Sequence, residues 1–119
     1  MVITQVVPPY YLTDLKTVAL YRWTLEKFEP GTRPNFVSLE GFVDAMVLVE
    51  GLKKAGNELT REGLVRGIES IRETDVGLGP QLKLDYSAKD HKGFDHVIPT
   101  VVRGGRAVPF TDWSIVVAK

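Results

Sequence analysis

The sequence has no cysteine, no excess of either charge and no long apolar run, and each absence excludes a class of protein. Without cysteine the chain has no disulfides, no thiolate nucleophile and no cysteine-ligated zinc. Its 15 Lys and Arg residues balance 15 Asp and Glu residues, so the basic surface typical of nucleic-acid-binding proteins is not expected. No apolar run reaches the roughly 18 residues of a membrane span.

The length and composition predict a single domain over residues 1–119. At roughly 150 residues per domain the chain is long enough for one domain, and its hydrophobic fraction of 44% is enough to fill a core. The first residues, Met1–Thr4, contain no basic segment and lead directly into a strand-like segment. We therefore expect no signal peptide in this chain.

The first half of the sequence predicts one strand and two helices. Val2–Val7 is β-branched and almost continuously apolar, which is typical of a strand buried on both faces in a parallel sheet. Thr13 is predicted to cap a first helix, and Ser38 to cap a second helix that ends near Ala55. The second helix is apolar almost all round from Phe42 to Val49, which predicts a buried helix.

The second half predicts a third helix followed by strands. Thr60 is the expected cap of that helix. The alternation over Leu82–Tyr86 is typical of a half-buried strand, and Gly104-Gly105 is a two-residue hairpin signal. Pro99 restricts its strand to a sheet edge or to interrupted pairing. Trp113–Val117 is expected to form one more short strand.

This order of elements is α/β, with more apolar surface than the chain can cover. The second helix needs neighbours on most sides, and the first strand needs parallel partners. The sequence therefore predicts part of a larger fold.

Several segments, taken in order, resemble the C-terminal part of type I periplasmic-binding proteins of the leucine/isoleucine/valine-binding family. They are Val6–Pro8, Tyr21–Phe28, Pro34–Phe42, Val47–Gly56, Leu59–Glu62, Asp90–Gly93 and Val101–Pro109. The resemblance implies an α/β fragment of the first lobe, with three helices on a small sheet and a C-terminal antiparallel hairpin. It also implies a periplasmic or extracellular parent protein that closes on an amino acid or similar small solute and delivers it to the membrane subunits of an ABC importer.

The same resemblance assigns ligand-binding residues. The family has an aromatic residue facing the ligand side chain at the position of Phe36, and Ser38 lies at the same helix start, where ligands of α/β folds bind. Tyr10 and Tyr11 follow a strand end and could face the same cleft. The alternatives are that Phe36 is a hydrophobic anchor, Ser38 only a cap, and the tyrosines packing residues.

Acidic and histidine residues gather between Asp85 and His96, but their spacing fits neither a zinc helix nor an EF-hand, and a polar turn is expected there. We expect no metal, no cofactor and no catalytic residue, and hence no enzyme. Two alternatives stay open: a self-associating fragment without ligand binding, and a small metal-dependent enzyme built on this turn. The uncovered apolar surface further predicts that the isolated fragment forms a homo-oligomer.

Overall fold

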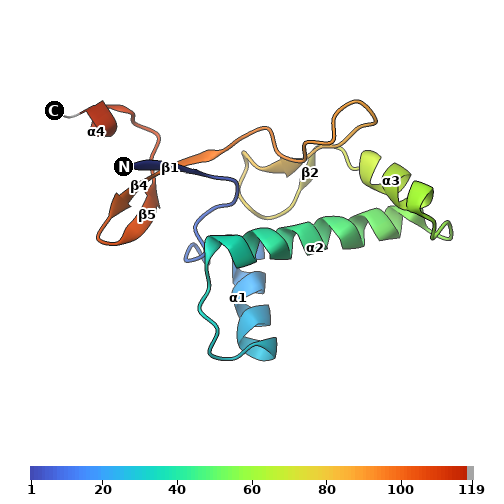
Figure 1. The fold of residues 1–119 in the computed structure, drawn as a ribbon, viewed down its shortest axis with the longest axis horizontal. Coiled ribbons are helices and arrows are strands. Elements are labelled where there is room, and N and C mark those ends of the chain that lie inside the picture. Colours follow the sequence, from blue (N-terminus) through green and yellow to red (C-terminus); the bar gives the residue numbers. More distant parts are fainter. Residues whose placement is uncertain (118–119) are drawn as a thin grey trace.

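The computed structural model describes residues 1–117, which form a mixed α/β structure. It measures 57 × 37 × 20 Å, with the helices together and a small sheet at one end (Figure 1). The elements in chain order are β1 Val2–Gln5, α1 Lys16–Phe28, α2 Phe36–Ala55, α3 Arg61–Glu69, β2 Thr74–Asp75, β3 Lys83–Leu84, β4 Ile98–Arg103, β5 Arg106–Pro109 and α4 Ser114–Val117.

The main sheet has the strand order β1-β4-β5 and is antiparallel throughout. The hairpin signal is confirmed, because Gly104 and Gly105 both have positive φ and join β4 to β5. The expected parallel pairing of the first strand is wrong. β1 instead pairs antiparallel with β4, and Ile3 and Thr4 are exposed, because the strand that reaches it from the C-terminal part runs in the opposite direction.

Of the two alternatives expected for Pro99, an edge strand or interrupted pairing, the structure shows the second. β4 is the middle strand, and Pro99 is in register with Thr4 of β1. Pairing with β5, however, begins one residue later, at Thr100 opposite Pro109. Pro99 has no N–H to donate, so on that side only its carbonyl is used, accepting from the Phe110 N–H at 3.1 Å.

Two of the three predicted helix caps are wrong. Asn35, not Ser38, caps α2, because its side-chain oxygen accepts from the Ser38 N–H at 2.9 Å. α1 begins only after Leu15, since Thr13 lies in a turn closed by its N–H on the Tyr11 carbonyl. The third is confirmed, with the Thr60 oxygen accepting from a backbone N–H of the first turn of α3 at 3.0 Å.

The strand expected at the end of the chain is a short helix instead. The Asp112 carboxylate accepts from the Ser114 N–H at 2.9 Å, and the Val116 N–H donates to the Trp113 carbonyl at 3.1 Å. This local cap outweighs the β-propensity of the residues that follow it.

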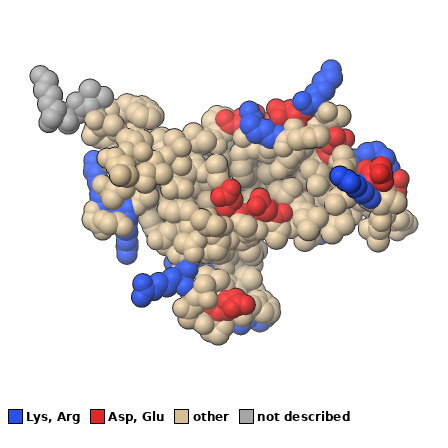
Figure 2. Space-filling view, in the orientation of Figure 1, with Lys and Arg blue, Asp and Glu red and all other residues tan. Residues whose placement is uncertain are grey.

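α2 is long, as predicted, but it is not covered on all sides. Only Leu39, Val43 and Gly51 are buried on it, whereas Leu48 and Val49 are about half exposed. Charged side chains lie mainly toward the ends of the molecule, and the central surface is largely uncharged apart from one acidic group (Figure 2).

The core lies where α1 and the first half of α2 meet the loops of the chain. Its buried members are Val7, Val18, Tyr21, Leu39, Val43, Leu78 and Leu82. The second half of α2 packs on α3 through two glycines, Gly51 and Gly67, whose backbones approach closely. Among the described residues, no helix is long and apolar enough to cross a membrane.

Candidate functional site

Two of the predicted ligand-binding residues lie together at the N-terminus of α2. The Tyr10 and Phe36 rings pack edge to face, with 5.3 Å between centroids and 82° between planes. Tyr10 follows the buried pair Pro8 and Pro9, which fixes its loop. Tyr11 packs edge to face on Tyr10 at 5.7 Å. We call Tyr10, Tyr11 and Phe36 the aromatic corner.

Ser38 lies in the same first turn of α2 as Phe36, and its hydroxyl is hydrogen-bonded within the protein. Its oxygen is paired with the hydroxyl of Tyr21, and it donates to the Asn35 carbonyl at 3.3 Å. The Tyr21 oxygen also accepts from the Asn35 N–H at 3.2 Å. These bonds attach the start of α2 to α1, so Ser38 helps to fix the position of Phe36. Tyr21 was missed as a site residue because the sequence shows it only as one member of an apolar stripe.

Tyr11 connects the aromatic corner to the C-terminal hairpin. Its hydroxyl donates to the Ala107 carbonyl in β5 at 2.7 Å. The Arg106 guanidinium carbon lies 5.7 Å from the centroid of the Tyr11 ring, within the range of a cation–π contact. Nothing in the sequence pattern indicates this contact, because Tyr11 and Ala107 are 96 residues apart.

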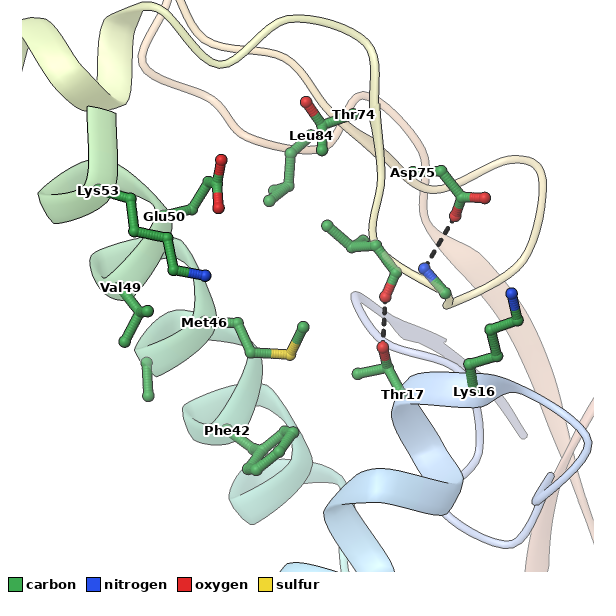
Figure 3. Close-up of a pocket in the computed structure, with 13 residues that line it drawn as sticks. Lys16, Thr17, Phe42, Met46, Val49, Glu50, Lys53, Thr74, Asp75 and Leu84 are labelled. Atoms are coloured by element: carbon green, nitrogen blue, oxygen red, sulfur yellow. Dashed lines mark hydrogen bonds between the residues drawn. The ribbon is translucent and has the colours of Figure 1, made fainter.

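A groove of about 560 Å³ runs along one side of α2, facing α1 and the segment that contains β2 (Figure 3). Phe42, Met46 and Val49 form its apolar wall, and Lys16 and Lys53 are at its rim. This composition suits an apolar side chain or a packed polypeptide better than a small polar ligand. None of the predicted site residues lines it.

A second groove, of about 370 Å³, lies on another side of α2. Val43 and Val47 of α2 face Phe94 and Tyr86 across it. Burial raises the pKa of the Tyr86 phenol, and the Asp44 carboxylate raises it further. Tyr86 is therefore a neutral hydrogen-bonding group in a groove that the charged side chains of Glu40, Asp44 and Lys92 also line.

Of the acidic and histidine residues in the 85–96 segment, Asp85, His91 and Asp95 each pair with a different side chain. Asp85 pairs with Arg72 at 3.1 Å, and His91 Nε2 lies 2.9 Å from a Glu69 oxygen. Lys92 lies 2.9 Å from Asp95 and lowers the pKa of its carboxyl by hydrogen bonding and by charge. Within residues 1–117 no three His, Asp or Glu side chains converge on a point where a metal ion could bind.

Comparison with solved structures gives the class of the fold. The chain superposes with a TM-score of 0.87 and 28% identity on a possible leucine/isoleucine/valine-binding protein from Rhodopirellula baltica SH 1, over 99% of this chain and 31% of that one. It also superposes on a substrate-binding periplasmic protein from Ralstonia solanacearum, with a TM-score of 0.73 and 24% identity, over 85% of this chain and 28% of that one. No protein-family profile and no curated protein matches the chain.

The chain therefore has the fold of a partial lobe of a type I periplasmic-binding protein, which confirms the resemblance seen in the sequence. It spans about a third of the length of the two solved structures.

Proposed function

We propose that residues 1–119 form part of the first lobe of a solute-binding protein for branched-chain amino acids or related small solutes. In this proposal the whole protein works in the periplasm or outside the cell and passes its solute to the membrane subunits of an ABC importer. The observation that carries the proposal is the match over 99% of the chain to a possible leucine/isoleucine/valine-binding protein.

The aromatic corner is the part of this chain that we propose contacts the solute. Phe36 and Tyr10 are both partly exposed, and their edge-to-face rings offer an apolar surface suited to an aliphatic side chain. The Ser38 oxygen retains acceptor capacity beyond its present partners and is proposed to accept from the ammonium group of an amino acid. Groups for the rest of the solute come from outside the chain.

Calorimetric titration with leucine, isoleucine and valine tests the proposal on the natural polypeptide that carries this sequence. Phe36→Ala should weaken leucine binding by roughly tenfold to a hundredfold, since it removes the burial of one aromatic side chain. Phe28→Ala is the matched control, because Phe28 is 64% exposed at the far end of α1. Leucine binding that is unchanged by Phe36→Ala contradicts the site, and no binding of any of the three contradicts the function.

Residues 1–119 produced alone should bind these amino acids weakly or not at all. A closing cleft satisfies the ligand with groups from two lobes, and half of such a site leaves polar ligand atoms unpaired. A micromolar dissociation constant for the isolated chain would show that its own residues suffice.

The exposed surface favours a second candidate, self-association without ligand binding. The accessible surface is 8215 Å², against roughly 6,450 Å² expected for a folded monomer of this mass. The radius of gyration is 16.4 Å, against about 13.5 Å for a compact domain of this length. The excess, about 1,750 Å² per copy, is as much as a copy buries in an obligate dimer.

Light scattering at micromolar concentration tests self-association of the isolated chain, for which we expect a homodimer or higher oligomer. Leu48→Glu on the exposed side of α2 should dissociate it, whereas Leu59→Glu, at a 74% exposed loop position, should not. A monomer that unfolds cooperatively contradicts this candidate, because it would show that the chain covers its own core.

A further inference from the structure

A continuous line of aromatic contacts runs from the C-terminal hairpin to the start of α2. Arg106 lies over the Tyr11 ring, Tyr11 packs on Tyr10, and Tyr10 packs on Phe36. The Tyr11 hydroxyl fixes the hairpin end of the line through its 2.7 Å hydrogen bond to the Ala107 carbonyl. A shift of the hairpin is therefore passed directly to the residues proposed to contact the solute.

The parts joined by this line are otherwise connected by two chain crossings and by Ile98 of β4, which packs against the buried core cluster. The β1-β4-β5 sheet lies at one end of the molecule, and α2 extends away from it toward α3 at the opposite end (Figure 1). The backbone passes between them at residues 6–15 and again at residues 85–97. Residues of the first crossing pack in the helical core, since Val7 is 2% exposed and Tyr10 packs against the buried cluster. From this fixed segment the Tyr11 side chain extends to β5.

We propose that Tyr11 is a positioning residue that sets the orientation of the hairpin relative to the helices and thereby holds Tyr10 against Phe36. The hydrogen bond from its hydroxyl fixes the hairpin, because the acceptor is a backbone carbonyl that no side-chain change on β5 can remove. Arg106 adds a contact by covering the Tyr11 ring. The part of the proposal that concerns the solute rests on the proposed function, whereas the part that concerns orientation does not.

Tyr10 provides the matched control for the hydroxyl. Tyr10 and Tyr11 are adjacent and half-buried in the same aromatic corner, but within residues 1–117 only the Tyr11 hydroxyl has a hydrogen-bond partner. Tyr11→Phe removes one hydrogen bond and leaves the ring in place. Tyr10→Phe removes a hydroxyl at the neighbouring position without removing such a bond. A difference between the two variants therefore reports the bond to Ala107.

Distance measurement between two spin labels tests the orientation. The chain has no cysteine, so Glu26→Cys on α1 and Arg103→Cys at the hairpin provide unique exposed attachment sites. Dilution with unlabelled chain suppresses distances between copies. Losing one neutral hydrogen bond should raise the population of other orientations about five-fold in Tyr11→Phe, seen as a broader distance distribution. Tyr10→Phe should keep the original distribution.

Helix content by circular dichroism separates a change of orientation from unfolding. If Tyr11→Phe loses its helix signal, Arg106→Gln, which leaves every aromatic ring in place, is measured instead and should also broaden the distribution. An unchanged distribution in the folded variant overturns the proposal. Equal broadening by Tyr10→Phe also overturns it, because the hydrogen bond would then not be the element that fixes the hairpin.

The solute part is tested in the natural polypeptide by leucine titration. Tyr11→Phe should weaken leucine binding several-fold, although Tyr11 is not proposed to touch the solute, and Tyr10→Phe should weaken it less because its ring remains. Leucine affinity that is unchanged by Tyr11→Phe overturns the role of Tyr11 at the site. If the parent chain binds no leucine at all, the proposed function fails, and the distance measurement still decides the orientation.

Discussion

Gly67→Ala tests the packing of α3 on α2. A Cβ at Gly67 would press on the Gly51 carbonyl oxygen and lie 3.0 Å from the Ala55 nitrogen, both of them backbone atoms of α2. Backbone atoms in a helix cannot move aside like the end of a flexible side chain, so the two helices must separate. At Gly41, also in a helix, an added Cβ meets nothing within 4 Å.

Gly67→Ala and Gly41→Ala gain the same stabilisation from replacing a helical glycine, but only Gly67→Ala introduces a steric clash. Replacing glycine by alanine inside a helix stabilises it by up to about 1 kcal/mol, because the unfolded chain loses freedom. Overpacking costs about 1–3 kcal/mol, and contact with backbone places Gly67→Ala at the upper end. Gly67→Ala should therefore destabilise the chain by about 2 kcal/mol, whereas Gly41→Ala should stabilise it by up to about 1 kcal/mol.

Thermal unfolding followed by circular dichroism measures both variants. At about 4 °C per kcal/mol for a chain of this size, Gly67→Ala should lower the Tm by roughly 8 °C and Gly41→Ala should raise it by a few degrees. Gly67→Ala with a Tm equal to or above that of the parent chain would refute the close approach of the two helices. A drop for Gly41→Ala as large as that for Gly67→Ala would show that helix glycines matter for a reason other than this crossing.

Two further predictions concern the ends of α3. Thr60→Ala should lower the free energy of unfolding by about 1 kcal/mol, measured as a lower urea midpoint at an unchanged m-value, because the Gly63 N–H loses its side-chain acceptor. The hydrogen bond and the charge of Arg66 lower the pKa of Glu58 in the folded chain, so the stabilisation from this pair is present above the carboxyl's unfolded pKa and is lost as the pH falls through its folded value. Arg66→Gln should therefore reduce the fall of the urea midpoint between about pH 5 and pH 3, and an unchanged pH profile would show that this exposed pair contributes nothing measurable.

The sequence predicted the elements whose signals are local. The end of α2 at Ala55, the Thr60 cap and the hairpin at Gly104-Gly105 depend on side chains within a few residues of one another, and all three are confirmed. The family resemblance likewise came from the sequence, since it depends on the order of short segments. The pairing of Tyr10 with Phe36 was not predicted, although both residues were proposed for the same cleft.

What the sequence could not determine depends on contacts between distant residues or on competition between neighbours. Val2–Val7 has the pattern of a parallel strand, but the direction of its partner is decided only when β4 returns from the other end of the chain.

The N-cap of α2 also could not be determined from the sequence. Ser38 and Asn35 are both good caps, and the choice between them follows from Tyr21, which takes the Ser38 hydroxyl as its partner.

The role of the helical glycines depends entirely on the tertiary structure. Gly41, Gly51 and Gly67 look alike in the sequence. Only the structure shows that an added Cβ would meet nothing within 4 Å at Gly41, the Ile68 side chain at Gly51 and the Gly51 carbonyl oxygen at Gly67. The difference arises because α2 and α3 cross at the last two positions and not at the first.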